Sequence, residues 1–319
     1  MDTVRVGVVG VGALGRHHAR VYASLPGAEL VGVVDTSPGR AEEVARNLGT
    51  RPFSSHVELF GKVDAVSIAT PTTLHADIGT QFLNEKIHVL VEKPITHNLE
   101  DADRLIRAAQ QNGRVLQVGH LERFNPAVVS LREMVRKPRF FEAHRMGLFS
   151  PRSLDIDVIL DLMIHDLDII CLLVPSPVVQ VSAVGIAILT NRIDIANARI
   201  HFEDGCVANI TASRVSMEKI RKLRLFQKQE YLSLDYTRQD IAVFTLNPTP
   251  GAAIPEIVSR KITPEKKEPL QQELSAFLNS IRGMGPVECS GEEGRKALAL
   301  ALQVLQKAEK AQAREIDRA

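Results

Sequence analysis

The chain has 319 residues, enough for about two domains whose cores need neither a disulfide nor a structural metal. Its 39 lysines and arginines and 38 aspartates and glutamates give a formal net charge of +1, which argues against a protein that coats nucleic acid. No apolar stretch is long enough to cross a bilayer, no signal peptide precedes the first strand-like run, and the three widely separated cysteines argue against a disulfide scaffold. We therefore expect a globular cytoplasmic protein without a nucleic-acid or membrane partner.

Short, valine-rich runs alternate with helix-like segments in the first part of the chain. The predicted strands are Val4–Val9, Leu30–Val34, Ala65–Ala69, His88–Val91 and Val115–Val118, and the predicted helices are Arg16–Ser24, Gly39–Leu48, Leu74–Asn84 and Leu99–Gln111. Continuous apolar runs are typical of parallel strands that are buried on both faces. The alternation predicts a doubly wound α/β Rossmann domain over residues 1–120.

The pattern changes in residues 121–319, where strand-like segments follow one another closely. The predicted helices are Asn125–Val135, Leu160–Leu173, Leu270–Ile281 and Glu292–Ala313, and the predicted strands are Arg139–Met146, Val178–Leu189, Asp194–Phe202, Cys206–Arg214, Lys222–Gln227, Tyr231–Asp235, Ile241–Phe244 and Ile257–Ile262. This order predicts an α+β domain with a mainly antiparallel open sheet.

A glycine-rich turn, Gly10-Val11-Gly12-Ala13-Leu14-Gly15, follows the first predicted strand and opens the first helix. Gly10 permits a tight turn, Gly12 lets the backbone approach a pyrophosphate, and Gly15 lets the helix pack closely on the sheet. The helix start would hold the phosphates, so we expect Ala13 and Leu14 to bind the cofactor with the glycines. A glycine-rich turn without a ligand is the alternative.

Asp35 ends the second predicted strand, about twenty residues after Gly15, where a carboxylate would accept hydrogen bonds from the adenosine ribose. A carboxylate there repels a 2′-phosphate, which favours NAD. The neighbouring Arg40 leaves NADP as the alternative cofactor.

Three further motifs point to a family. The segment Ala69-Thr70-Pro71-Thr72-Thr73-Leu74-His75 follows the third strand, Glu92-Lys93-Pro94 follows the fourth, and Asp161 and His165 stand four residues apart. With these motifs the whole chain resembles the glucose–fructose oxidoreductase/inositol dehydrogenase (Gfo/Idh/MocA) family. The resemblance implies an enzyme that oxidises one secondary hydroxyl of a sugar or cyclitol and passes the hydride to NAD(P).

The resemblance also implies roles for individual residues. Lys93 would contact substrate and nicotinamide, while Asp161 and His165 would line the sugar pocket, with His165 as the base. Thr70, Pro71, His75 and Glu92 would belong to the cofactor site.

The chemistry of the residues agrees with these roles, since removal of a hydroxyl proton suits a histidine, and Asp161 and His165 would share a helix face. The alternatives are a core histidine at 165, a solvated lysine at 93 and a mere strand-ending turn at Thr70-Pro71.

Two segments, Val118–Pro126 and Asp161–Asp166, resemble the members that act as UDP-N-acetylglucosamine 3-dehydrogenases. In such an enzyme His120, Arg123 and Asn125 would bind the substrate. Candidates for a diphosphate contact are Arg123, Arg145 and Arg152, and an interdomain salt bridge is the alternative for Arg123.

The chain departs from the family at Asp155–Leu160, which replaces the usual Gly-Gly run before the Asp-x-x-x-His motif and predicts a different local loop shape and a different choice of substrate. A dehydrogenase of inositol or of a free sugar is therefore the alternative to a UDP-N-acetylglucosamine enzyme. A non-catalytic dinucleotide sensor is the alternative from another class, although a sensor has no chemical need for Lys93, Asp161 and His165 together.

No metal is expected, because His165, Asp166 and Asp168 match no zinc spacing. The expected partners are a small-molecule substrate, in the leading hypothesis a nucleotide sugar, and further copies of the chain. The resemblance implies a homodimer or homotetramer that forms through the C-terminal sheet.

Overall fold

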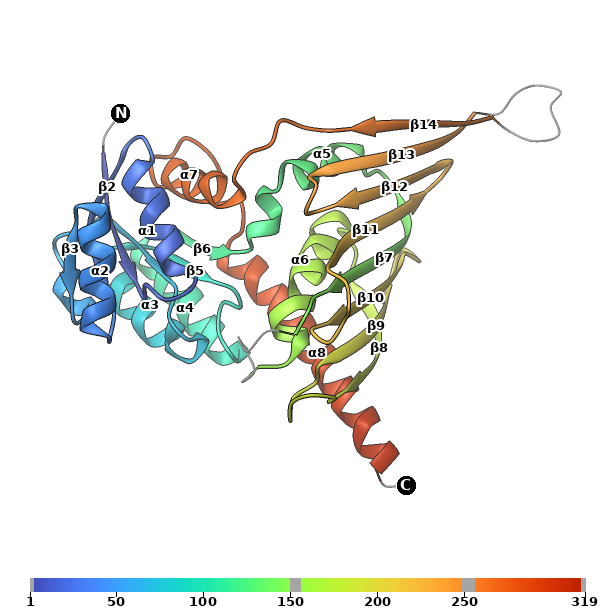
Figure 1. Ribbon diagram of the computed structural model, residues 1–319, viewed down its shortest axis with the longest axis horizontal. Coiled ribbons are helices and arrows are strands. Elements are labelled where there is room, and N and C mark those ends of the chain that lie inside the picture. The colour runs from blue at the N-terminus through green and yellow to red at the C-terminus, as the bar shows by residue number, and fades with distance from the viewer. Residues whose placement is uncertain (1–2, 150–155, 248–255, 317–319) are drawn as a thin grey trace. The chain divides into compact units, whose positions relative to one another are not determined.

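A computed structural model describes residues 3–149, 156–247 and 256–316 (Figure 1). The chain divides into two compact units, the first made of Met1–Phe124 and Glu268–Leu298 and the second of Asn125–Lys267 and Ala299–Ala319. The segment Glu268–Leu298, which the predicted bounds place in the second domain, therefore groups with the first unit.

The first unit is built on a parallel sheet. Its strands in the described residues are β1 (Val4–Val9), β2 (Ala28–Val34), β3 (Arg51–Phe53), β4 (Ala65–Ile68), β5 (His88–Glu92) and β6 (Leu116–Gly119). Their order, β3-β2-β1-β4-β5-β6, is that of a Rossmann sheet and confirms the predicted fold class. Strand β3 was not predicted, because three residues that include an exposed arginine and a proline carry no apolar run.

Helices cover both faces of this sheet. They are α1 (Gly15–Ser24), α2 (Pro38–Leu48), α3 (His75–Asn84) and α4 (Leu99–Asn112), with 3₁₀ turns η1 (His56–Leu59), η2 (Thr72–Leu74) and η3 (Leu121–Phe124). Local chemistry fixes their ends: Asn98 caps α4 by accepting the N–H of Asp101 at 2.8 Å, and Gly113 ends the same helix in a left-handed conformation.

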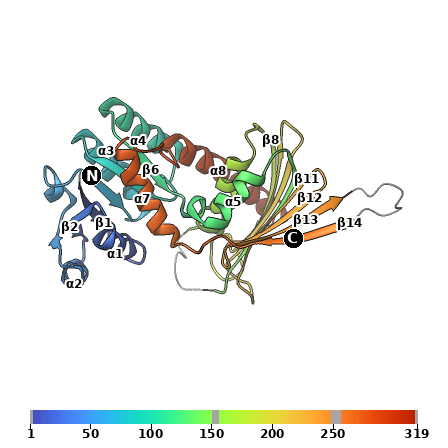
Figure 2. The same ribbon diagram turned by 90° about the horizontal axis from the view of Figure 1, so that it is seen from above.

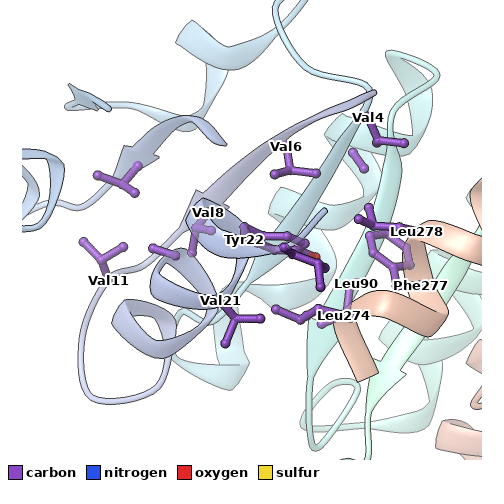
Figure 3. Close-up of a cluster of buried hydrophobic side chains, with 14 of the residues drawn as sticks. Val4, Val6, Val8, Val11, Val21, Tyr22, Leu90, Leu274, Phe277 and Leu278 are labelled. Carbon is purple, nitrogen blue, oxygen red and sulfur yellow. The ribbon is translucent and has the colours of Figure 1, made fainter. Parts of the chain in front are cut away.

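A late helix, α7 (Pro269–Ile281), completes the core of the first unit. Its residues Leu274, Phe277 and Leu278 pack into a cluster with Val4, Val6 and Val8 of β1 and with Tyr22 of α1 (Figure 3). All three side chains of α7 are at least 99% buried. Burial of this apolar stripe explains why the segment groups with a sheet that lies about 200 residues earlier in the chain.

The second unit contains α5 (Pro126–Met134), a π-helical turn (Ile159–Met163), α6 (Ile164–Leu173) and most of α8 (Gly291–Ile316). Its strands in the described residues are β7 (Pro138–Met146), β8 (Val178–Ile186), β9 (Ile195–Phe202), β10 (Val207–Ser213), β11 (Ile220–Gln227), β12 (Glu230–Asp235), β13 (Asp240–Asn247) and β14 (Glu256–Ile262). They form one sheet in the order β14-β13-β12-β11-β7-β10-β9-β8 (Figure 1), which Figure 2 shows from above.

The mainly antiparallel character of this sheet is confirmed, with one parallel pair, β7 and β10. Alternation along β10 is clear, since Ala208, Ile210 and Ala212 are fully buried while Asn209 and Thr211 are partly exposed. In the described part of the chain, no helix has both the length and the apolar character needed to cross a membrane.

Replacing Phe277 by Ala should lower the free energy of unfolding by about 3–5 kcal/mol, because it opens a cavity in the cluster that joins α7 to the first unit. Denaturant unfolding measures this change. The matched control is Gln271→Ala, an exposed position on the same helix, which should change stability by at most about 0.5 kcal/mol. Equal effects of the two substitutions would contradict the packing of α7 described above.

Candidate active site

The glycine turn after β1 has the backbone geometry of a phosphate-binding loop. Gly10 has a φ of +83°, and a Cβ on it would lie 2.8 Å from the carbonyl oxygen of Ala69. A Cβ on Gly15 would lie 1.7 Å from the carbonyl oxygen of Gly10, so only glycine lets α1 start this close to the strand. A Cβ on Gly12 would have no atom within 4 Å, which leaves room for a ligand against the backbone there.

The start of α1, at Leu14 and Gly15, has no side-chain cap. The first-turn N–H groups and the positive end of the helix dipole therefore suit a phosphate group that approaches over Gly12 and Ala13. This arrangement fits the pyrophosphate of a dinucleotide.

Asp35 lies at the end of β2 with 6% of its surface exposed. Its carboxylate accepts the backbone N–H of Val11 at 3.0 Å and that of Ser37 at 2.9 Å, and Arg40 Nη1 lies 3.3 Å from Oδ1. These donors fix the carboxylate in an orientation from which it can accept further hydrogen bonds. The guanidinium of Arg40 partly offsets its charge.

A cleft of about 510 Å³ runs from this carboxylate to the loop after β4. Its lining includes Gly10, Gly12, Asp35, Thr70 and Pro71, five of the predicted cofactor-binding residues. The structure thus brings these residues, which are spread over about 60 positions of the sequence, to the carboxyl edge of one parallel sheet, where such folds bind ligands.

His75 supports this loop from behind rather than from the cleft. It is 1% exposed, with Nε2 at 2.9 Å from the carbonyl oxygen of Thr70 and Nδ1 at 3.1 Å from that of Pro94. Burial lowers the pKa of the imidazole. The neutral imidazole donates its single N–H to one of these two carbonyl oxygens, and the ring lies between the Thr70-Pro71 loop and the Glu92-Lys93-Pro94 loop.

Glu92 ends β5 and is buried, while Lys93 is half-buried. Glu92 Oε1 lies 2.9 Å from Nε2 of His18, and Oε2 accepts the backbone N–H of Lys93 at 3.1 Å. Burial alone would raise the pKa of Glu92, but the hydrogen bond and charge of His18 and the charge of Lys93 outweigh it and hold the pKa below its usual value. A carboxylate therefore stands directly before the lysine.

The second unit places Asp161 and His165 at the start of α6. Asp161 lies in the π-helical turn, and His165 lies in the first turn of α6; both side chains are half-buried, whereas Asp166 and Asp168 are buried. The predicted helix Leu160–Leu173 is present, but its first turn is wider than an α-helix. Such turns occur frequently at functional sites.

A buried ion pair holds this helix against the sheet. Arg145 of β7 donates to Asp166 through Nε at 2.7 Å and Nη2 at 3.1 Å, and its guanidinium lies 4.8 Å from the centre of the Tyr236 ring. Both charged side chains are at most 3% exposed. Arg145, a candidate for a diphosphate contact, is thus engaged with the residue next to His165.

Arg123 and Asn125 also have structural partners. Arg123 donates to Glu293 and to the carbonyl oxygen of Glu288, both at 2.8 Å, and these three residues belong to the first unit. The Asn125 side chain caps α5 by accepting the N–H of Ala127 at 3.1 Å and donates to the carbonyl oxygen of Tyr236 at 3.0 Å. His120, directly after β6, is 1% exposed.

Arg152 and Asp155 lie outside the described residues. The rest of the segment that departs from the family is anchored within the second unit, where Asp157 Oδ1 accepts the N–H of Ile193 at 2.9 Å.

Glu273 on α7 was missed by the sequence analysis. It is fully buried in the first unit, and burial together with the negative charge of Glu92 raises its pKa well above the usual value. The available signal was a single glutamate within the apolar stripe of Leu274, Phe277 and Leu278.

Fold and site together define an oxidoreductase with an NAD-binding Rossmann unit. Residues 4–120 match the family described as "Oxidoreductase family, NAD-binding Rossmann fold", and residues 135–229 match its "GFO/IDH/MocA C-terminal domain". The chain belongs to the Gfo/Idh/MocA family.

Among curated relatives, UDP-N-acetylglucosamine 3-dehydrogenase of Acidithiobacillus ferrooxidans is 43% identical over 95% of this chain and 97% of its own. A scyllo-inositol 2-dehydrogenase of Bacillus subtilis is 34% identical over 67% of this chain and 68% of its own. A crystal form of the Acidithiobacillus enzyme superposes with a TM-score of 0.91 at 42% identity, over 97% of this chain and 99% of that one. The predicted family, fold and NAD cofactor are thereby confirmed.

Replacing Gly12 by Ala should weaken NAD binding by at least about tenfold while the melting temperature changes by less than about 2 °C, because the added Cβ meets only the space needed by the pyrophosphate. Gly15→Ala is the contrasting variant, since its Cβ collides with Gly10 and should lower the melting temperature. Isothermal titration with NAD and thermal unfolding separate the two effects. Wild-type affinity in folded Gly12→Ala would exclude this route for the pyrophosphate.

Proposed function

We propose that the protein oxidises the C3 hydroxyl of UDP-N-acetylglucosamine to a ketone, with NAD as the hydride acceptor. The observation that carries this substrate is the 43% identity over nearly the whole length to an enzyme of that name. Inositol dehydrogenases match less well, at 34% identity over two thirds of the chain or at 26% over 93%. They remain the comparison against which the substrate must be tested.

The cofactor would lie along the cleft between Asp35 and Pro71, with Gly10, Gly12, Ala13, Leu14 and Gly15 around its pyrophosphate and Thr70 beside it. NAD, when bound, accepts the hydride. Asp35 supports NAD over NADP, because its buried carboxylate would repel a 2′-phosphate. His75 and Glu92 would act from behind, His75 by supporting the Thr70-Pro71 loop and Glu92 by fixing the backbone of Lys93.

The substrate oxidation needs one base and one electrophile. In the proposal, His165 accepts the proton of the C3 hydroxyl as the hydrogen on C3 leaves with its electron pair, so that the C–O single bond becomes a carbonyl. Lys93 donates a hydrogen bond to the same oxygen and stabilises the charge that develops on it. Asp161 orients the imidazole or binds a neighbouring hydroxyl.

His120, Arg123 and Asn125 were predicted to bind substrate. Arg123 forms an ion pair with Glu293, and the Asn125 side chain caps α5. We propose that these bonds shape the segment after β6 and that His120, Arg123 and Asn125 contribute contacts to the substrate from it. The reaction would take place in the cytoplasm, where NAD and nucleotide sugars are available.

Purified protein with NAD, UDP-N-acetylglucosamine and a carbonyl trap should form NADH, whereas UDP-glucose, myo-inositol and glucose should give much less. His165→Ala should lower kcat by about 10²- to 10⁴-fold and leave the Kd for NAD within about twofold. His201→Ala, a histidine of strand β9 in the same unit, is the matched control and should keep full activity.

Turnover with inositol alone would retain the mechanism and replace the substrate. NAD binding without oxidation of any of these compounds would favour the non-catalytic sensor.

The exposed face of the second-unit sheet supports self-association. Phe140, Phe226, Tyr231 and Phe244 form a row across adjacent strands, with successive ring centres 5.8, 4.8 and 5.5 Å apart. Further apolar side chains lie exposed on this sheet, including Val184 at 54% and Ile257 at 65%. We propose that two or four copies associate through this face, since contiguous apolar surface of this kind marks interfaces.

Phe226→Asp combined with Phe244→Asp should convert a dimer or tetramer into monomers, because two charges would be buried without partners at the interface. Light scattering after size exclusion gives the mass. Val129→Asp on α5, at a position that is also exposed, is the control and should leave the mass unchanged. A monomeric wild-type protein would overturn the proposal.

A further inference from the structure

The interior of the first unit contains several buried ionisable side chains, among them His18, Glu92 and Glu273. Glu273 of α7 is 0% exposed, and among the described residues neither oxygen of its carboxyl has a hydrogen-bond partner. A buried carboxyl without partners is strongly unfavourable in its charged form, so such a residue is unusual in a helix that otherwise packs with leucine and phenylalanine.

The neighbours of Glu273 connect it to the lysine that we propose to contact the substrate. Its backbone carbonyl accepts a hydrogen bond from the Gln117 side chain of β6 at 3.3 Å. The charge of Glu92 acts on it directly, and Glu92 is in turn bonded to His18 at 2.9 Å and to the backbone N–H of Lys93 at 3.1 Å. Glu92 thus links α1 to the end of β5 through hydrogen bonds, and Glu273 is a second buried carboxyl of the same unit, on which the charge of Glu92 acts.

Two carboxyls in one buried space do not both ionise readily, because their mutual repulsion is weakly screened. Here the surroundings of the two differ. Glu92 has a hydrogen bond from His18 and the adjacent charge of Lys93, which lower its pKa, whereas burial and the charge of Glu92 raise the pKa of Glu273. Glu92 is therefore the ionised member and Glu273 the neutral acid.

Other charged and titratable groups lie on the elements around Glu273. Helix α7 packs against α1 and η3. The groups on these elements and on the neighbouring strand ends are Arg16, His17, His18, Arg20 and Tyr22 of α1, Glu92 at the end of β5, Lys93 after it, His120 after β6, and Glu122 and Arg123 of η3. The Tyr22 hydroxyl bonds to Ser67 at 3.0 Å, and burial raises its pKa beyond the physiological range, so it stays neutral.

We propose that Glu92 is the positioning residue for Lys93 and that Glu273, as a neutral acid, limits this buried group to one negative charge. Ionisation of Glu273 at alkaline pH would place a second carboxylate beside Glu92, disturb its bonds to His18 and to the backbone of Lys93, and slow the enzyme. The expected effect on catalysis rests on the function proposed above. The charge states of Glu92 and Glu273 are independent of that function.

Glu273→Gln replaces the neutral acid by an isosteric neutral amide and provides the first test. At neutral pH its kcat and KM should stay within about threefold of wild type. As the pH rises above neutral, wild type should lose at least about tenfold more of its kcat than the variant loses. Glu268→Gln makes the same change at an exposed position just before α7 and should follow the wild-type profile.

Thermal unfolding tests the charge state without any substrate. A folded-state pKa raised above the usual 4.5 means that the stability contributed by Glu273 is complete below that pH and is lost progressively as the pH rises toward the folded-state pKa. The melting temperature of Glu273→Gln should therefore exceed that of wild type by a margin that grows with pH, to at least about 3 °C at pH 9.

Glu92→Gln tests the positioning role and the coupling. It should lower kcat at least about tenfold while the Kd for NAD stays within about threefold, because it weakens the fixed link to Lys93 and leaves the cofactor cleft intact. In this background the stabilising effect of Glu273→Gln at high pH should shrink, because the repelling charge is absent.

Parallel melting-temperature profiles of Glu273→Gln and wild type would overturn the charge assignment even if the enzyme proves to act on another substrate. A stability difference as expected, together with unchanged kcat in Glu92→Gln, would refute the positioning role alone. Absence of turnover in wild type would refute the proposed function. The melting-temperature profiles would then still test whether Glu273 is the neutral acid.

Discussion

Helix α1 leaves strand β1 so closely that a Cβ on Gly15 would lie 1.7 Å from the Gly10 carbonyl oxygen, and the cofactor side of the first unit depends on this approach. Gly15, His18 and Tyr22 follow at spacings of three and four, so they share the helix face that is turned toward the sheet. From this face His18 reaches Glu92, and Tyr22 reaches Ser67. The contact that shapes the phosphate-binding turn thus also places the histidine that fixes the loop before Lys93.

In the second unit a buried ion pair positions the helix that carries His165. Arg145 and Asp166 form two hydrogen bonds between strand and helix, and the ring of Tyr236 lies over the guanidinium. A buried ion pair contributes little net stability, but removing one partner is strongly unfavourable. Because the two hydrogen bonds of this pair are directional, they hold the helix that carries His165 in one orientation against β7.

These two arrangements share a physical principle. Hydride transfer requires groups that are already oriented before the substrate arrives, since small displacements reduce the rate steeply. In each unit the residues that we propose to act on substrate lie next to a carboxylate, Glu92 or Asp166, which is buried and hydrogen-bonded. Neither carboxylate needs to touch the substrate to influence the reaction.

Sequence alone determined the features that depend on local order. Valine-rich runs predicted all strands of the first unit except β3, the glycine spacing predicted the dinucleotide loop, and three short motifs predicted the family. Tertiary structure decided what depends on contacts between distant segments: the grouping of α7 with the first unit, the ion pairs of Arg123 and Arg145, and the burial of Glu273 beside Glu92. Local patterns record which face of an element is apolar, but a charged residue shows its partner only when the chain has folded, because that partner lies anywhere along the sequence.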